Sequence, residues 1–181
     1  MLNYNAVAVN VDALMPNISD LGSGKRLIFD IREATAADRA TIAGFNSLMA
    51  EETEGKALDP DVIGPGVGAV LSDPTKGRYW LATVDGETAG QIMVTYEWSD
   101  WRNGMMWWIQ SVYVVQRFRR QGVFSALYKH VESIARTDKN VRGLRLYVEN
   151  SNERAQDTYR AFKMTQPYLV MESLFGNPKE E

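Results

Sequence analysis

The sequence contains no cysteine and a single histidine among its 181 residues. The absence of cysteine excludes disulfides, a cysteine nucleophile and thiolate metal sites, and it is compatible with a reducing compartment. With one histidine, a histidine-based zinc site or a serine–histidine triad has little material to work with. We therefore expect a protein that holds no metal and draws its chemistry from other residues.

Long hydrophobic runs are also missing. No segment reaches the roughly 18 consecutive apolar residues that a membrane span needs, and residues 1–18 contain no Lys or Arg, so they lack the charged start of a signal peptide. A net charge of −3 gives no general basic surface for binding nucleic acid. We expect a cytoplasmic protein whose partners include neither nucleic acid nor a membrane.

The length fits one compact domain with its own core. The composition, 45% hydrophobic and 24% charged, is that of an ordinary globular protein. The run at residues 20–25 is flexible in composition, which favours a boundary after it. We expect an N-terminal extension over residues 1–26, a domain over 27–176 and a C-terminal tail over 177–181.

Hydrophobic periodicity predicts an α/β domain in the order strand, one or two helices, three antiparallel strands, helix, strand, helix, strand. Asp85-Gly86 and Asn103-Gly104 are hairpin-turn signals between the three central strands. Residues 54–76 are rich in Gly and Pro and offer at most one short helix. The predicted strands are 27–32, 79–84, 88–98, 105–115, 144–148 and 168–174, and the predicted helices start near Ala36, Gly122 and Asn152.

The segment 114–127 carries most of the chemistry, because it lies where a predicted strand gives way to a helix. A helix N-terminus has free N–H groups and a partial positive charge, and both favour anions. Arginines at 117, 119 and 120 add charge, and Gly122 lets the backbone approach a ligand closely. We predict a phosphate or pyrophosphate site; the alternative is a basic loop whose glycine serves only the turn. The segment matches neither a Walker A nor a Rossmann motif.

The pattern Arg119-x-x-Gly122 resembles the acyl-CoA-binding motif Gln/Arg-x-x-Gly-x-Gly/Ala of the GNAT family, the Gcn5-related N-acetyltransferases. The sequence departs from that motif at Phe124, which stands where the family usually has Gly or Ala. Because Phe124 begins the apolar stripe of the helix, we expect its ring to point into the core.

A second segment resembles another motif of the same family, Asn-x-x-Ala-x-x-x-Tyr. It is formed here by Asn152, Ala155 and Tyr159, and Lys163-Met164 replaces the usual Gly-Phe. Two motifs in the family's order, each at a strand-to-helix junction, are more specific than either one alone.

The resemblance implies a mixed, mostly antiparallel central sheet of six to seven strands flanked by about four helices. It implies acetyl-CoA as cofactor and direct transfer of its acetyl group to a primary amine of a small molecule or peptide. The strand before the phosphate loop would be splayed from its parallel neighbour and would offer its main chain to the pantetheine arm. The cofactor-binding residues implied are Val112, Tyr113, Val114, Arg119, Arg120, Gln121, Gly122, Val123, Phe124, Ser125, Asn152, Ala155 and Tyr159.

Tyr159 resembles the family's general acid, a phenol placed at the thiol sulfur; the alternative is a tyrosine that only packs on the sheet. The resemblance also implies that Asn152 hydrogen-bonds the pantetheine arm; the alternative is that it only caps its helix. Glu97 is the candidate general base, with Asp100 and Glu149 as other carboxylates in reach of such a role.

One hairpin concentrates tryptophans and acids. Glu97, Trp98, Asp100 and Trp101 would form an acceptor site that attracts a cationic amine by charge and cation–π contact, although core and hairpin packing explains the tryptophans as well. Adjacent Trp107 and Trp108 must face opposite sides of the sheet.

Two other functions stay open. One is a non-catalytic acyl-CoA-binding module or sensor, and the other is an interaction protein whose N-terminal extension and tryptophan hairpin form a dimer or partner surface. A homodimer is compatible with each of the three hypotheses.

Overall fold

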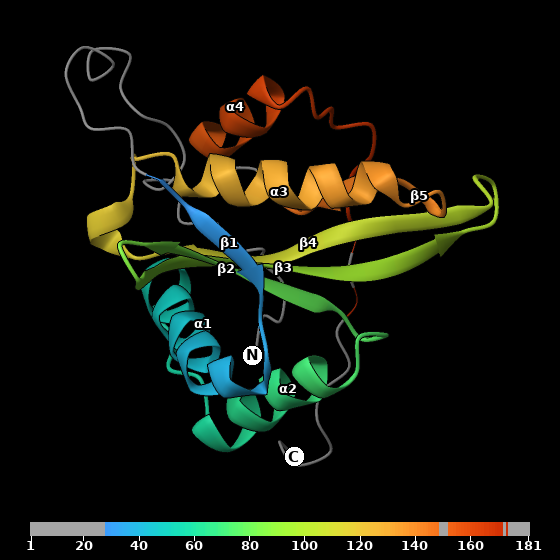
Figure 1. The fold of residues 1–181 in the computed structure, drawn as a ribbon. Coiled ribbons are helices and arrows are strands. Elements are labelled where there is room, and N and C mark those ends of the chain that lie inside the picture. Colours follow the sequence, from blue (N-terminus) through green and yellow to red (C-terminus); the bar gives the residue numbers. More distant parts are fainter. Residues whose placement is uncertain (1–27, 149–151, 172, 174–181) are drawn as a thin grey trace, which may run out of the picture.

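The computed structural model describes residues 28–148, 152–171 and 173. Within them the chain forms one five-stranded sheet in the order β1-β2-β3-β4-β5. Helices α1 and α2 cover one face, and α3 and α4 lie over the other (Figure 1). The strands are β1 (Asp30–Glu33), β2 (Arg78–Val84), β3 (Glu87–Ser99), β4 (Gly104–Val114) and β5 (Val141–Leu146), and the helices are α1 (Arg39–Glu54), α2 (Pro60–Ser72), α3 (Val123–Thr137) and α4 (Glu153–Ala161).

The sheet is mixed but mostly antiparallel: β1 to β4 pair antiparallel in sequence order, and only β4 and β5 are parallel. The two predicted hairpin turns are confirmed. Asp85, Gly86 and Asn103 have φ angles of 50°, 83° and 44°, the left-handed conformation that such turns require. The turn residues themselves therefore specify the antiparallel order of β2, β3 and β4.

The α/β class is confirmed, but the predicted number of strands is too high for the described part of the chain. The predicted strand at 168–174 is wrong over residues 168–171 and 173, which form no strand, while residues 172 and 174 lie outside the described ranges. Tyr168, Leu169, Val170 and Met171 are 65–95% exposed. A strand needs a neighbour to pair with, and a short apolar run does not supply one.

The segment between α1 and β2 holds more helix than its glycines indicate. Asp59 caps α2 by accepting a hydrogen bond from the N–H of Asp61 at 2.8 Å, and Pro60 occupies the first helical position, where no N–H is needed. Favourable capping thus starts a helix of 13 residues here.

Two hydrophobic cores stabilise the sheet. The larger lies between the sheet and α3, where Phe124, Leu127 and Val131 are fully buried at the predicted helical spacing. The smaller lies beneath α1 and α2 and includes Ile42 and Val67.

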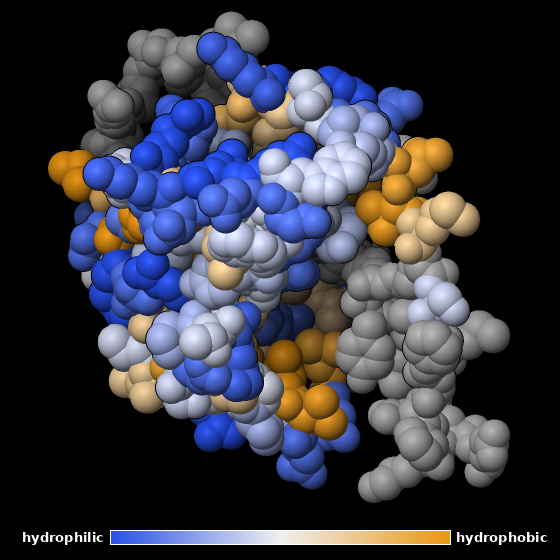
Figure 2. All heavy atoms as spheres, turned by 90° about the vertical axis from the view of Figure 1, so that its right-hand side faces the viewer, coloured by the Kyte–Doolittle hydropathy of each residue, from blue (hydrophilic) through white to orange (hydrophobic). Residues whose placement is uncertain are grey.

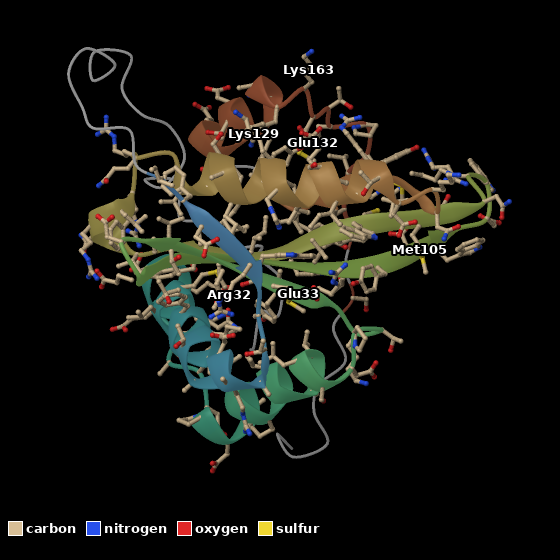
Figure 3. The ribbon with its side chains drawn as sticks, viewed as in Figure 1. Arg32, Glu33, Met105, Lys129, Glu132 and Lys163 are labelled. Atoms are coloured by element: carbon tan, nitrogen blue, oxygen red, sulfur yellow. The ribbon has the colours of Figure 1, made fainter. Side chains whose placement is uncertain are left out.

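Two ion pairs tie the edge strand β1 to its surroundings. Arg32 donates to Asp38 at 2.8 Å, and Arg78 donates to Glu33 at 2.7 Å; Arg32 and Glu33 are labelled in Figure 3. No helix in the described ranges combines the length and hydrophobicity that crossing a bilayer requires. The expected extension, residues 1–26, and tail, residues 177–181, lie outside the described residues.

Candidate cofactor-binding and active site

The parallel pairing of β4 with β5 ends partway along β4, where β5 itself ends. Their pairing runs from Met105 opposite Val141 to Ile109 opposite Leu146, and β4 then continues to Val114. A β-bulge at Gln110 shifts the register of β4 against β3 at this point. The last part of β4 therefore has no strand beside it on the β5 side within the described residues.

The main chain of this free part of β4 is directed by its pairing with β3. The N–H of Val115 donates to the carbonyl of Ala89 on the β3 side at 2.9 Å. Because successive strand residues alternate in direction, Val112 and Val114 direct their main-chain groups toward the β5 side, and Tyr113 directs its own toward β3. Of the three predicted residues, Val112 and Val114 thus direct main-chain groups to the β5 side, where the carbonyl of Val114 already accepts the Nε–H of Arg119 at 2.9 Å.

The loop from β4 into α3 ends in an uncapped helix N-terminus. Gly122 is the N-cap residue with φ of 91°, and no side chain caps the helix. The N–H of Ala126 donates to the Gly122 carbonyl at 3.0 Å, so the N–H groups of Val123, Phe124 and Ser125 precede the first bond of the helix. These N–H groups and the helix dipole would favour an anion, so the geometry is compatible with the predicted phosphate site, which stays a prediction.

The polar side chains of the loop mostly bind the protein itself. Arg117 pairs with Glu87, and Gln121 donates to the carbonyl of Arg117 at 2.6 Å. Arg119 turns inward, with only 9% of its side chain exposed. Arg120 has φ of 62° and is exposed. Arg117 and Arg119 thus have partners within the protein, whereas no side chain caps the N–H groups at the start of α3.

Phe124 points inward, as expected from its place in the apolar stripe. It is fully buried and meets the ring of Tyr159 at a centroid distance of 6.1 Å. Tyr159 is 3% exposed, and its hydroxyl has no hydrogen-bond partner among the described residues. Burial raises the pKa of Tyr159 well above its usual range. The two motifs of the sequence therefore meet in space.

The second motif also begins a helix as predicted. Asn152 caps α4, because its Oδ1 accepts the N–H of Ala155 at 3.1 Å. Ala155 is fully buried. Helix capping thus accounts for the Asn152 oxygen, and a contact with a cofactor arm stays a prediction.

The four residues predicted for the acceptor site do not form one pocket. Glu97 and Trp98 are neighbours on β3 and so face opposite sides of the sheet. Trp98 is 57% exposed, Trp101 at the turn is 91% exposed, and Asp100 accepts the N–H of Trp101 at 2.8 Å.

Glu97 belongs instead to a cluster that sequence patterns did not predict. Its two carboxylate oxygens accept hydrogen bonds from Arg145 and from the Trp108 indole, each at 2.6 Å. Tyr147 stacks on Trp108 at a centroid distance of 4.5 Å. The cluster lies at the end of the β4–β5 pairing, and Trp108 faces away from Trp107, which packs in the core beneath α3.

A cavity of about 1380 Å³ lies beside β5, bordered by α3, α4 and the chain that follows α4. Tyr159 and Trp108 line it, as do Glu132 and Lys163, which Figure 3 labels. None of residues 117–125 is among its lining. Figure 2 shows the side of the molecule at the right of Figure 1 as mostly hydrophilic, with separate hydrophobic clusters. The cavity reaches the predicted acid but not the phosphate loop.

Carboxylates and histidine are not grouped for a metal: the part of the chain that the structure describes holds no set of three or more such side chains suited to one. Helix α1 directs polar side chains toward β4 that no sequence motif predicted. Asn46 is buried and accepts from Gln91 at 2.7 Å and from Ser111 at 3.1 Å. In the sequence these residues look like the ordinary polar face of a surface helix, so nothing in the local pattern marks Asn46 as buried.

These features define a mixed α/β protein in which the parallel pairing of β4 with β5 ends before β4 does, and in which α3 follows β4 with an uncapped N-terminus. A model of the "Acetyltransferase (GNAT) family" matches residues 42–164. The chain therefore belongs to the GNAT acetyltransferase family.

The comparison with solved structures agrees. A "possible acetyltransferase from Clostridium difficile 630" is 47% identical with a TM-score of 0.77, covering 83% of this chain and 99% of that one. AAC(6')-Iy, solved with the bisubstrate analogue CoA-S-monomethyl-acetylneamine, is 16% identical with a TM-score of 0.67, covering 83% of this chain and 99% of that one. The second likeness shows the shared fold alone.

One curated relative is similar over a shorter stretch. A thialysine N-epsilon-acetyltransferase of Bos taurus is 34% identical over 86 residues, which are 45% of this chain and 49% of that protein. The chain thus spans about half the length of the curated relative it matches.

Proposed function

We propose that this protein transfers the acetyl group of acetyl-CoA to a primary amine by direct attack, with no covalent enzyme intermediate. The observation that carries the proposal is the buried, unpartnered hydroxyl of Tyr159, which lies against Phe124 in the first turn of α3. A buried polar group without a partner is costly and calls for a ligand. The thiol end of a cofactor held at that helix would supply one.

The residues present fit such a cofactor. The N–H groups of Val123, Phe124 and Ser125 would bind its diphosphate, and the main chain of Val112 and Val114 would pair with the pantetheine arm. When bound, acetyl-CoA supplies an activated thioester carbonyl. The main-chain N–H groups of β4 would stabilise the oxyanion that forms on that carbonyl as the amine attacks.

Tyr159 would be the general acid. Burial raises the pKa of its hydroxyl, so it stays protonated at neutral pH and has a proton to give. As the carbon–sulfur bond breaks, Tyr159 would donate that proton to the leaving thiolate. Its surroundings hold the ring in place, since Phe124 packs against it edge to face.

Glu97 would serve the acceptor side. By strand alternation its cluster with Trp108 lies on the sheet face opposite the phosphate site, so an amine could reach the thioester without crossing the cofactor. A carboxylate there would attract an ammonium group and take up its proton before attack. To do so Glu97 must exchange its bond with Arg145 or Trp108 for one with the substrate.

The acceptor is proposed to be a small-molecule or peptide amine. The name of the curated relative gives thialysine as the first compound to try. Cytoplasmic location and a homodimer remain predictions made from the sequence.

Calorimetric titration with acetyl-CoA, followed by thiol-release assays, tests the proposal. The panel would contain thialysine, polyamines, amino acids, aminoglycosides and peptides. We expect saturable binding and thiol release with at least one amine. Tight binding without turnover over the whole panel would favour the non-catalytic acyl-CoA module, and no binding would favour the interaction protein.

A further inference from the structure

The carboxylate of Glu52 joins three elements around the phosphate loop. Its Oε1 accepts the hydroxyl of Tyr113, near the end of β4, at 3.0 Å. Its Oε2 accepts a guanidinium N–H of Arg119, in the loop before α3. Glu52 itself lies in the last turn of α1. One side chain therefore ties α1 to the strand and to the loop that the proposed function uses.

Arg119 is held from both ends of its guanidinium. Its Nε donates to the carbonyl of Val114 at 2.9 Å, and its guanidinium carbon lies 5.6 Å from the ring centroid of Tyr113. Because only 9% of the Arg119 side chain is exposed, its charge needs a carboxylate close by, and Glu52 is that carboxylate. The charge of Arg119 is thus already neutralised inside the protein and is not directed at a ligand.

The turn that follows Arg119 is conformationally strained. Arg120 has φ of 62° and Gly122 has φ of 91°. A left-handed conformation is costly for a residue with a Cβ but not for glycine, so the strain lies at Arg120, which keeps this conformation only while the neighbouring chain is fixed. Helix α3 fixes the turn on one side, and the Glu52–Arg119 pair fixes it on the other.

We propose that Glu52 is a positioning residue, which acts through Arg119 to hold the turn at Gly122 in the geometry that binds a diphosphate. Arg119 itself, implied as a cofactor ligand by the resemblance, is then a positioning residue as well. This inference rests on the proposed use of acetyl-CoA. It extends that site to α1, which neither of the two family motifs includes.

The test compares Glu52→Gln and Arg119→Gln with Glu51→Gln as the matched control. Glu51 is the exposed preceding residue, so its variant loses the same charge at the same helix end. Hydrogen exchange of residues 116–125 in the free protein reports on the turn without any cofactor. We expect exchange to become at least about fivefold faster in the first two variants and to stay unchanged in the control.

A second readout separates positioning from general destabilisation. With acetyl-CoA as donor we expect kcat/KM to fall about tenfold in Glu52→Gln, through a higher KM for the donor. With S-acetylpantetheine, a thioester without the diphosphate, we expect no change. The double variant should be no worse than Arg119→Gln alone, because both substitutions break one interaction.

Unchanged exchange in the turn, or equal losses with both donors, would overturn the inference. Failure of the wild type to bind acetyl-CoA would instead refute the proposed function, and the positioning of a diphosphate site would fall with it. The exchange experiment distinguishes these failures, because it needs no ligand.

Discussion

The ring of Tyr159 in α4 meets the ring of Phe124 in α3 edge to face, 6.1 Å apart between centroids at an interplanar angle of 75°. Phe124 stands where the family motif usually has Gly or Ala, and its ring therefore supports Tyr159, the residue proposed as the general acid. Phe124 also contacts Tyr128 and Phe162, so the aromatic packing joins α3, α4 and the chain after α4. A bulky residue at this position is compatible with an open phosphate site because it occupies the core.

Tyr159→Phe should lower the rate of acetyl transfer by about 10²–10⁴-fold, because the general acid is lost. The free energy of unfolding should change by less than ~1 kcal/mol or rise, because the hydroxyl removed has no partner. Thiol release across pH 6–9 and urea denaturation measure the two effects. Full turnover at every pH would remove the acid role.

Strongly alkaline pH should destabilise the fold. Burial raises the pKa of Tyr159 and of Tyr79, so these groups remain protonated in the folded state after the unfolded chain begins to lose protons near pH ~10. The unfolded state then binds fewer protons, and stability falls as pH rises. Their contribution is fully present below about pH 10 and is lost above it. Urea midpoints at pH 9 and 11 test this, and the drop should be smaller in Tyr159→Phe.

Gly122→Ala should destabilise the protein by about 1 kcal/mol and weaken acetyl-CoA binding. A Cβ at Gly122 would meet only Phe29, at 3.9 Å, so the cost comes from the φ angle and not from a clash. Gly44→Ala is the control, since Gly44 lies inside α1 with nothing within 4 Å of an added Cβ. That variant should be more stable by about 0.5–1 kcal/mol. Equal thermal shifts in the two variants would contradict the argument.

Asn46→Ala should destabilise the protein by about 2–3 kcal/mol. Its Oδ1 accepts from Gln91, which is fully buried, and from Ser111, and both donors would lose their partner. Denaturant unfolding measures the loss. A double variant that also carries Gln91→Leu should recover part of it, because the stranded amide is removed; no recovery would place the cost elsewhere.

Glu97→Gln should raise the KM for the amine acceptor and leave the KM for acetyl-CoA unchanged, since Glu97 bonds to Trp108 and Arg145 on the sheet face opposite the proposed diphosphate site. Trp101→Ala should affect neither constant, and the free energy of unfolding should stay within about 0.5 kcal/mol, because Trp101 is 91% exposed at the turn. Steady-state kinetics with the best acceptor measures both KM values in each variant. An effect on acceptor KM in Trp101→Ala alone would restore the hairpin turn as the acceptor site.

The sequence by itself determined the elements whose signals are local. The hairpin turns at Asp85-Gly86 and Asn103-Gly104, the inward stripe of α3 that begins at Phe124, and the cap of α4 at Asn152 depend on contacts within a few residues. The two motifs identified the family for the same reason, since each is a short strand-to-helix junction.

Only the tertiary structure decided which distant residues meet. It paired Arg119 with Glu52, far earlier in the chain, placed Glu97 with Arg145 rather than with Trp101, and left residues 168–171 exposed where a strand was predicted. A local pattern states which face of an element is apolar. It does not state which helix or strand will cover that face, because the partner is chosen by burial and by pairing of charges across the whole fold.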